Sequence, residues 1–434
     1  MNFGFFGVQF SFGLQQSNMS AIYKYLGANE SEIPILWLAG PITGLIIQPI
    51  IGAISDGTWS PRFGRRKPFF LIGAVCASIA LVLMPYSSTI WMAASLLWIL
   101  DAGNNIALEP YRAFVSDQLE EEQHSLGFLM QSFFTGLGST LANFTPAILI
   151  GFGFFAMTDT FSNGIPVSTY WAFFIGAFAS IATILYSIFT TKEYPPTAEE
   201  LIALQEEKAK GHLLSRTWYG IVDAMKTMPL TMKQLIPVMF FSWYAMFCYW
   251  QYLTSALSLS LYDTLDESTI GFKTSQVLTG QVNGTYNIIC FMVAFALVPF
   301  ARKYGAKGTH FVSLIFGGAC VMAIPLLSNT DALLTIPIAG LGITWASMMA
   351  MPYQLLAGSI PSDKTGVYMG IFNMFIVIPM IIQIFTMQYF VYDLLGNNPI
   401  NVIRLAGVCL ILGGIFTMFI TVKKPLEEDA QVVI

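Results

Sequence analysis

Long apolar stretches dominate the sequence, and their number and length constrain the fold more than any other feature. A helix of about 20 apolar residues spans the hydrocarbon of a bilayer, and within lipid a helix satisfies its own backbone hydrogen bonds. Only 10% of the 434 residues are charged, against about 25% in soluble domains, which excludes a water-soluble globule. We therefore predict an all-α membrane protein with twelve transmembrane helices. The predicted spans are residues 3–26, 33–56, 68–87, 90–116, 124–156, 168–190, 234–262, 277–300, 309–328, 333–357, 365–392 and 401–422.

The longest polar gap lies between the sixth and seventh spans and divides the chain into two parts. Residues 1–190 are predicted to form an N-terminal six-helix bundle, and residues 234–424 a C-terminal one. Residues 191–233 are predicted as a cytoplasmic linker with short helices, and residues 425–434 as a cytoplasmic tail.

Three short motifs recur at nearly constant spacing and indicate that the two bundles are related. Arg62-Phe63-Gly64 returns as Lys303-Tyr304-Gly305, Pro110-Tyr111-Arg112 returns as Pro352-Tyr353-Gln354, and Gly127 returns as Gly370, at offsets of 241, 242 and 243 residues. The sequence thus predicts two pseudo-symmetric halves, an architecture that alternates access to a site near the middle of the membrane.

Lysine and arginine predict the orientation, because basic residues gather in cytoplasmic loops. With both termini inside, 16 of the 20 basic residues fall in cytoplasmic loops. Those predicted outside are Lys24, Lys273 and Arg404. We therefore expect a multi-pass protein of the plasma (inner) membrane with both ends in the cytoplasm.

The fourth span carries ionisable residues where hydrocarbon makes charge costly, which marks a functional candidate. At 100° per residue, Asp101, Asn105 and Arg112 share one helix face, with Glu109 nearby. Burial favours a neutral carboxyl and a guanidinium favours a charged one, so Asp101, Glu109 and Arg112 are the proton-coupling candidates. We expect Asp101 and Arg112 to lie close together. The alternative is that Arg112 forms a structural ion pair with Glu109.

The second half offers no comparable group, since Asp101 maps onto Ile343 at the repeat offset. If a proton is bound in mid-membrane, the N-terminal half must bind it. The three histidines fall in or beside predicted loops, where we expect them at the surface. The sequence shows neither a metal-ligand spacing nor a nucleophile–base arrangement, so no metal, no organic cofactor and no enzymatic activity are expected.

Polar and aromatic residues on the predicted helices suit sugar recognition, because amides bind hydroxyl groups and aromatic faces cover C–H surfaces. Helix packing and hydrogen bonding between helices are the alternative explanation. The candidate substrate-binding residues are Gln9, Gln16, Asn105, Gln131, Trp243, Trp250, Gln251, Asn283, Asn287, Trp345, Tyr353 and Asn373.

The loop after the second span carries a patterned motif that runs from Gly52 to Phe69. A basic anchor on the membrane surface explains its arginines but not the spacing of its glycines and its aspartate. We assign Gly52, Asp56, Gly64, Arg65 and Arg66 to a gating loop.

This loop resembles the signature of the major facilitator superfamily, in a form similar to the sucrose/H⁺ symporters of the glycoside-pentoside-hexuronide cation symporter family. Gly7-Val8-Gln9-Phe10, Trp37-Leu38-Ala39-Gly40-Pro41, Asp101-x₂-Asn104-Asn105 and Asn373 to Pro379 resemble the same family. The resemblance implies the major facilitator fold, sugar uptake driven by a proton gradient, and coupling roles for Asp101 and Arg112. Glu109 and the aromatic seventh span depart from the family pattern.

The sequence therefore predicts a proton-coupled sugar symporter for a disaccharide or glucoside such as sucrose or maltose. A Na⁺-coupled or uncoupled carrier and a proton-driven exporter remain alternatives. The expected partners are the sugar and membrane lipid, without nucleic acid, and we expect the monomer to be functional.

Overall fold

The structure is a computed structural model that describes residues 1–56, 58–60, 63–193, 225–326, 336–357 and 365–421. Within these residues, each of the twelve predicted spans is helical over most of its length, in one helix or in consecutive helices. The first half contains α1 (Gly4–Tyr25), α2 (Ile33–Leu36), α3 (Ala39–Asp56), α4 (Lys67–Leu83), η1 (Met84–Tyr86), α5 (Ile90–Gln118), α6 (Glu121–Gly151) and α7 (Val167–Thr190). The second half contains α10 (Leu230–Tyr262), α11 (Ile270–Ala323), η2 (Ile324–Leu326), α13 (Ile336–Ala357), α14 (Thr365–Thr386), η4 (Met387–Val391), α15 (Tyr392–Leu394) and α16 (Pro399–Thr417).

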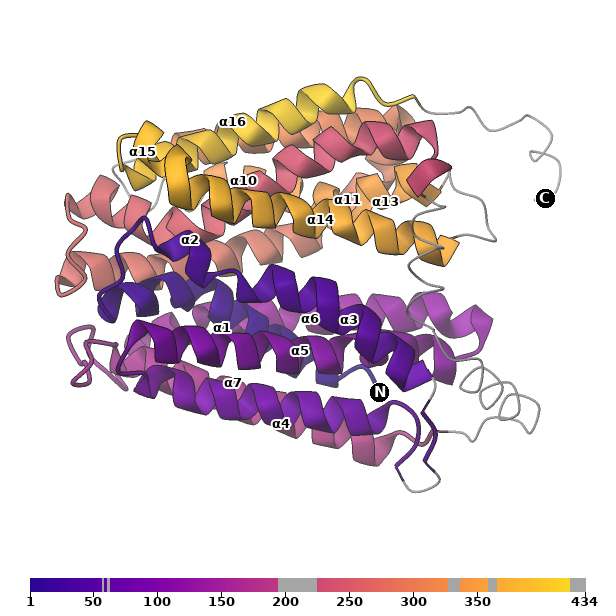
Figure 1. The fold of residues 1–434 in the computed structure, drawn as a ribbon, viewed down its shortest axis with the longest axis horizontal. Coiled ribbons are helices and arrows are strands. Elements are labelled where there is room, and N and C mark those ends of the chain that lie inside the picture. Colours follow the sequence, from indigo (N-terminus) through magenta and orange to yellow (C-terminus); the bar gives the residue numbers. More distant parts are fainter. Residues whose placement is uncertain (57, 61–62, 194–224, 327–335, 358–364, 422–434) are drawn as a thin grey trace.

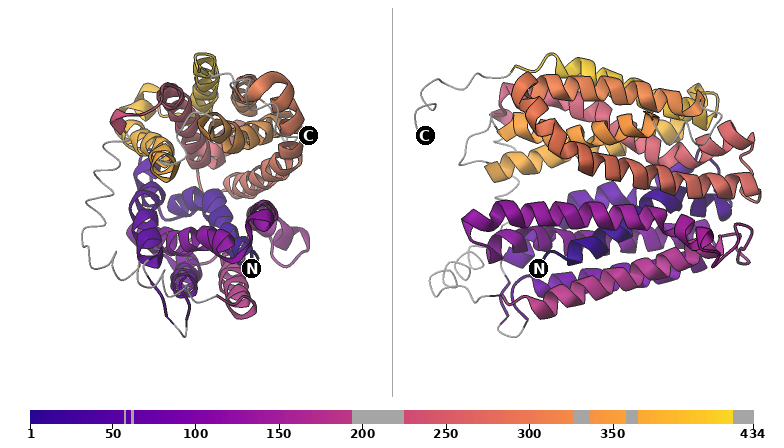
Figure 2. Two further views of the ribbon diagram at one scale, coloured as in Figure 1. Left: turned by 90° about the vertical axis from the view of Figure 1, so that its right-hand side faces the viewer. Right: turned by 180° about the vertical axis from the view of Figure 1, so that it is seen from behind.

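The helices form two bundles that lie side by side, with the first half below the second in Figure 1. A view along the helices shows the same two groups facing each other (Figure 2, left). The predicted fold of two six-helix bundles is thereby confirmed. Most of the predicted linker, and the whole predicted tail, fall on residues 194–224 and 422–434, outside the described residues, so these domain boundaries stay predictions.

The second span, and the eighth and ninth taken together, differ in detail from their predicted form. The second is broken at Trp37 and Leu38, because the ring of Pro41 would clash with the Trp37 carbonyl in a continuous helix. The eighth and ninth spans run on as one stretch, α11, which changes direction at Gly305 with φ 77° and ψ 155°. Glycine adopts this conformation without steric cost.

Seven described helical stretches are long and apolar enough to cross a membrane by a strict criterion of length and mean hydropathy, α11 counting as one of them. The other long helices are α1, α5, α10 and α13, which correspond to the first, fourth, seventh and tenth predicted spans and carry more polar or aromatic side chains. α1 packs against α5, α6 and α7 and also reaches α10 and α11, so protein surrounds it and can satisfy its polar side chains.

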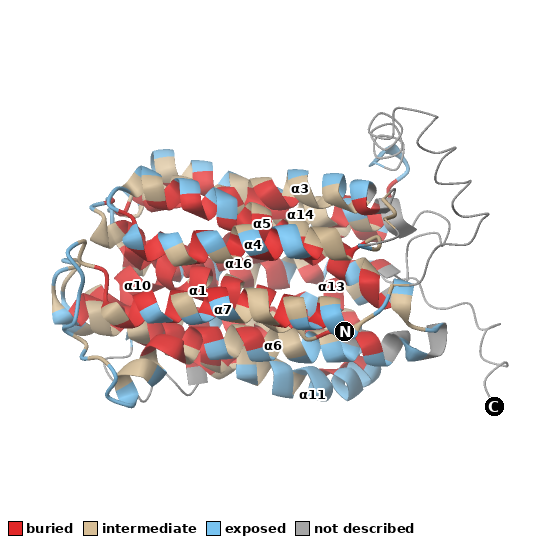
Figure 3. Cartoon of the chain, turned by 90° about the horizontal axis from the view of Figure 1, so that it is seen from below, coloured by how far each residue is buried: buried red, intermediate tan, exposed pale blue. Residues whose placement is uncertain are grey.

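The outward faces of the bundles are apolar. α11 exposes Met292, Phe295 and Val298, and Figure 3 shows exposed residues along this helix while buried residues follow the middle of the molecule. The halves meet mainly where α6 packs on α11, with further contacts between α3 and α14 and between α1 and α10. The α6–α11 contact is so close that a Cβ atom at Gly280 would collide with the Asn143 carbonyl.

Candidate functional site

Asp101 is fully buried inside the first half, and α1 and α3 surround its carboxyl group. The Gln15 side chain donates to Asp101 Oδ2 from α1 at 3.2 Å. Gly40 brings the backbone of α3 so near that an added Cβ would lie 3.6 Å from the same oxygen. Asp101 Oδ1 has no hydrogen-bond partner in the described part of the chain. One acid oxygen is therefore left available in an otherwise packed site.

One turn further along α5, Asn105 ties the helix to α3. Its amide nitrogen donates to Thr43 Oγ1 at 3.1 Å and to the Asp101 carbonyl at 2.9 Å, and its oxygen accepts from Gln48 at 2.6 Å. These bonds fix the face of α5 that carries the acid. Asn105, predicted as a substrate ligand, thus lies beside Asp101 and is bonded to protein in this conformation.

Exposure increases along this face of α5 toward the end that holds the N-terminus (Figure 1). Asp101 is 0% and Asn105 4% exposed, whereas the side chains of Glu109 and Arg112 are 36% and 51% exposed. Gly52 of α3 lies opposite Glu109, because a Cβ there would sit 3.6 Å from Glu109 Cγ. The face of α5 that carries the acid thus ends in partly exposed charged side chains.

The expectation that Asp101 and Arg112 lie close together is wrong for this conformation. Arg112 instead approaches Glu109, with Nη1 and Oε2 3.7 Å apart. Asp101 and Arg112 do share a helix face, but eleven residues of α-helix separate them by about 16 Å along the axis. A helical wheel reports the angle of a side chain and not its height.

Four aromatic rings from α10, α11 and α13 form a cluster in the second half. Trp345 of α13 lies at its centre, 5.7 Å from Trp243, 5.5 Å from Trp250 and 6.4 Å from Tyr286 between ring centroids. Trp250 donates to the Tyr286 hydroxyl at 3.3 Å. The Trp243 indole N–H is buried and has no partner among the described residues. The predicted residues Trp243, Trp250 and Trp345 are therefore brought together.

The aromatic cluster reaches the first half through Tyr286, whose hydroxyl lies beside the side chains of Gln16 and Asn287. Gln16 belongs to α1 and Asn287 to α11. Both are predicted substrate-binding residues, and the structure places them at the boundary between the halves. An aromatic surface and amide groups from both halves thus adjoin one another.

The side chains of Asn283 and Gln9 are hydrogen-bonded to other side chains of the same chain. Asn283 donates to Ser17 at 2.9 Å and accepts from the Tyr249 hydroxyl at 3.1 Å. Gln9 accepts a weaker bond of 3.4 Å from Ser139. Both atoms of the Asn283 amide are engaged in this conformation.

Other predicted residues occupy the second half or its edges. Gln251 of α10 is 1% exposed and accepts from Gln383 of α14 at 3.0 Å. The Tyr353 ring packs edge-on against Phe372 with centroids 5.0 Å apart. The remaining two predicted residues, which lie on α6 and α14 respectively and are both partly buried, are Gln131 and Asn373.

The predicted gating loop is fastened to the end of α7 by Glu193. Its carboxylate accepts hydrogen bonds from the backbone N–H groups of Arg65, Arg66 and Lys67. These groups open α4, where unsatisfied N–H donors and the helix dipole favour an anion. Gly64 is needed there because its φ is 79° and a Cβ would collide with the Glu193 carboxylate.

The Arg66 side chain joins the same loop to α3 and α5. It bonds to Asp117 at 2.8 Å and to Ser55 Oγ at 2.7 Å. The side chain of Asp56 is outside the described part of the structure, although its backbone ends α3.

Sequence reasoning missed the direct partners of the acid site. Gln15 and Gln48 were not among the candidates, although amides within apolar spans are a readable signal. The expectation that His310 lies at the surface is wrong, because it is 1% exposed in α11 and bonded to Ser347 at 2.8 Å. It lies near the start of its span, a position that the sequence alone leaves ambiguous.

The comparisons with known proteins all match transporters. The family model of the Major Facilitator Superfamily matches residues 1–384. The chain is 26% identical over 418 residues to the sucrose transport protein SUC4 of Arabidopsis thaliana, covering 87% of this chain and 80% of that protein. It is 24% identical over 475 residues to the sucrose transport protein SUT1 of Oryza sativa subsp. japonica, covering 96% and 86% respectively.

Solved structures share the fold at low sequence identity. The nucleoside transporter NupG matches with a TM-score of 0.66 at 14% identity, covering 96% of this chain and 99% of that one. A D-xylose-proton symporter matches with a TM-score of 0.65 at 14% identity, covering 96% of each chain.

Proposed function

Because the chain belongs to the major facilitator superfamily, we propose that it moves a sugar together with a proton by alternating access. Its relatives and its fold are those of transporters and not of enzymes. Two relatives are named sucrose transport proteins, which supports a sugar as the substrate class. A disaccharide or glucoside such as sucrose or maltose is the more specific proposal.

Asp101 carries the proposal of proton coupling. An isolated charge in the membrane interior is costly. Among the residues that the structure describes, the only side chain that donates a hydrogen bond to the Asp101 carboxyl is the neutral Gln15 amide. A proton that binds here neutralises the acid, and a proton that leaves restores its charge. The site therefore has a physical reason to exchange a proton as its surroundings change.

Glu109 and Arg112 lie on the route between Asp101 and the end of the molecule that holds the N-terminus. A guanidinium stabilises a nearby carboxylate, so movement that changes the distance from Arg112 to either acid alters proton affinity. We propose that Arg112 assists proton release on this side. Glu109 is the second acid available to a relay.

The aromatic cluster and the adjoining amides support the choice of substrate. Trp243 offers an unpartnered N–H, and the rings of Trp250 and Trp345 offer apolar faces. Gln16 and Asn287 adjoin them from the two halves. We propose that the sugar binds here, with its C–H faces on the aromatic cluster and its hydroxyl groups on the amides.

Uptake into proteoliposomes tests the proposal. Labelled sucrose, maltose, an aryl glucoside and xylose would be offered with an inward proton gradient, with an inward Na⁺ gradient, and with neither. Accumulation of one sugar above its external concentration only under the proton gradient is the expected result. Accumulation driven by Na⁺ alone, equilibration without either gradient, or proton-driven efflux would each favour one of the other carriers.

We further propose that both termini face the cytoplasm of a plasma (inner) membrane and that the monomer is the functional unit. The asymmetry of basic residues supports the orientation. In a cysteine-free background, a cysteine at Thr197 should resist an impermeant thiol reagent added to intact cells. Rapid labelling without permeabilisation would contradict this orientation.

A further inference from the structure

At the end of the molecule remote from the N-terminus, each half inserts one polar side chain into the other. We call this the distal end; it holds the α1–α2 connection and α15, on the left of Figure 1. Gln276 of α11 inserts into the first half, and Glu30 from the α1–α2 connection inserts into the second. They are 3% and 9% exposed respectively.

Gln276 uses both ends of its amide on the first half. Its nitrogen donates to Asn18 at 2.9 Å and to Thr169 at 3.1 Å, and its oxygen accepts from the Tyr25 hydroxyl at 2.7 Å. Asn18 and Tyr25 belong to α1 and Thr169 to α7. One side chain of the second half thus joins two helices of the first, and we call these four residues the Gln276 latch.

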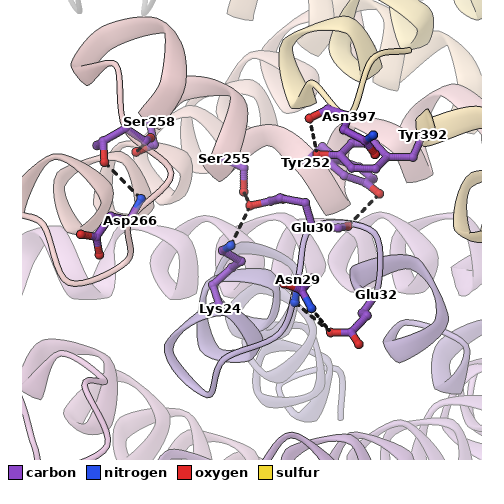
Figure 4. A network of polar contacts seen from close by, with 11 residues as sticks. Lys24, Asn29, Glu30, Glu32, Tyr252, Ser255, Ser258, Asp266, Tyr392 and Asn397 are labelled. Atoms are coloured by element: carbon purple, nitrogen blue, oxygen red, sulfur yellow. Dashed lines mark hydrogen bonds and ion pairs between the residues drawn. The ribbon is translucent and has the colours of Figure 1, made fainter. Parts of the chain in front are cut away.

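Glu30 makes the reciprocal contact, which Figure 4 shows. Its carboxylate accepts from Ser255 of α10 at 2.9 Å, and its backbone carbonyl accepts from the Tyr252 hydroxyl at 3.1 Å. Lys24 lies 3.2 Å from the same carboxylate oxygen and orients it from α1. The Tyr252 ring is held by stacking on Tyr392, with centroids 5.3 Å apart. These residues form the Glu30 latch.

We infer that the Gln276 and Glu30 latches hold the distal ends of the two halves together and set how often the empty carrier opens there. Their hydrogen bonds exist only while the halves touch, whereas separation exposes every one of these groups to water. Glu109 and Arg112 at the opposite end are partly exposed in the same conformation. Gln276 and Glu30 are therefore positioning residues for the alternation, and they need not touch the substrate.

The decisive variant is Gln276→Leu, which keeps the bulk of the side chain and removes three hydrogen bonds between the halves. If the distal-closed form loses the net free energy of one or two such bonds, the equilibrium between distal-open and distal-closed forms shifts on the order of tenfold toward open. Tyr25→Phe and Tyr252→Phe each remove one hydroxyl and should shift it roughly threefold. Either Tyr→Phe variant tests the inference if Gln276→Leu does not fold.

Asn163→Leu is the matched control. Asn163 lies at the same end and donates to the Pro85 and Ser87 carbonyls at 2.8 and 3.0 Å, within its own half. Its loss removes comparable bonds without touching the contact between halves, so the equilibrium should not move. An equal opening in Asn163→Leu would reduce the effect to general loosening and overturn the inference.

Two measurements report the equilibrium. The first is the distance between spin labels at Ser88 and Leu394, exposed distal residues of the two halves, in nanodiscs and in a background without the five native cysteines. The long-distance population should increase in Gln276→Leu. This arm needs no substrate, so failed sugar uptake would count against the proposed function and not against the latches.

The second measurement uses sugar uptake and rests on the proposed function and orientation, with the distal end outside. A larger outward-facing fraction lowers the external sugar concentration for half-maximal uptake by the factor by which that fraction increases. A folding defect would lower the maximal rate instead. A folded Gln276→Leu protein with unchanged label distances and unchanged half-saturation would overturn the inference.

A double-mutant comparison separates the two latches. Tyr25→Phe should add little to Gln276→Leu, because both remove the same hydrogen bond, whereas Tyr252→Phe should add its full effect. Equal additivity of both tyrosine variants would show that Tyr25 and Gln276 do not act together, and would contradict the Gln276 latch.

Discussion

The two halves share a helical plan but differ in the chemistry of equivalent positions. In the first half, Asp101 and Asn105 of α5 lie in a hydrogen-bonded network with α1 and α3. At an offset of 242 residues, α13 carries Ile343 and Ser347 instead. Ser347 bonds to His310 within the second half, and the neighbouring Trp345 belongs to the aromatic cluster. One half therefore carries the acid, and the other supplies aromatic surface.

This difference is possible because the repeat constrains the backbone more than the side chains. α5 and α13 are both fourth helices of their halves, and Asp101, Asn105 and Ser347 are buried in protein, where their polar groups avoid contact with lipid. α5 carries the carboxyl group of Asp101, whereas α13 carries the indole ring of Trp345. Charge coupling and sugar contact are thus expected to respond separately to substitution.

The largest effect should follow Asp101→Asn, which keeps the shape of the side chain and the Gln15 contact but removes the titrating group. Symport requires sugar and proton to raise each other's affinity, a coupling of about 1–3 kcal/mol. Uphill accumulation in vesicles with an imposed proton gradient should be lost, while exchange of sugar across the membrane persists.

Ile343→Val, at the equivalent position of the second half, is the control and should leave accumulation intact. Arg112→Gln should behave differently from both, because slower proton release inside would lower the rate of net uptake and not the final sugar ratio. Accumulation by Asp101→Asn equal to that of the unmodified protein would remove Asp101 from the mechanism and break the contrast between the halves.

The next effect concerns the aromatic half. Trp243→Phe retains an aromatic face and removes the unpartnered N–H. Loss of one hydrogen bond of about 1 kcal/mol to a sugar hydroxyl should raise the concentration for half-maximal uptake roughly fivefold, with the proton requirement unchanged. Uptake measured across sugar concentrations at two pH values tests this. A changed proton requirement would show that the two functions are not divided between the halves.

The sequence was sufficient for the helices because bilayer thickness fixes the length of an apolar run. Even there, the local break at Trp37 required knowledge of how Pro41 acts on the preceding turn. Asp101 was found because a charge in an apolar span is conspicuous and because Ile343 does not match it in the second half. These signals belong to single residues and need no knowledge of packing.

The rest of the site depends on which helices meet and at what height. The sequence placed Arg112 on the correct face of α5 and offered Asp101 or Glu109 as its partner, and in the structure the partner is Glu109. Gln15 lies within the first predicted span and Gln276 directly before the eighth. Neither position tells that Gln15 bonds to the acid or that Gln276 joins the halves. The role of Gln276 depends on the conformation of the carrier, which a linear pattern does not encode.

A smaller contrast distinguishes how each half secures the helix that follows its repeated loop motif. Glu193 accepts from three backbone N–H groups at the start of α4, whereas Lys307, which matches Arg66 at an offset of 241, donates once to the Ile420 carbonyl at 2.8 Å. Glu193→Gln should cost about 1–2 kcal/mol of stability, and Lys307→Gln about 0.5–1 kcal/mol. Thermal unfolding in detergent ranks them, and a larger loss for Lys307→Gln would contradict the assigned capping role.

The smallest effect is expected for Glu109→Gln, which tests whether the first half uses one acid or two. The Glu109 and Arg112 side chains are 36% and 51% exposed and 3.7 Å apart, and exposed ion pairs contribute about 0–1 kcal/mol. The melting temperature should therefore change little, and uphill uptake should remain, because Asp101 keeps its proton site and its Gln15 contact. Asp117→Asn, which disrupts a 2.8 Å bond to the buried Arg66, provides a comparison with a measurable stability loss. If Glu109→Gln abolishes accumulation while expression and melting temperature stay unchanged, Glu109 is a second relay group, and the proton path extends from Asp101 along α5 to Arg112.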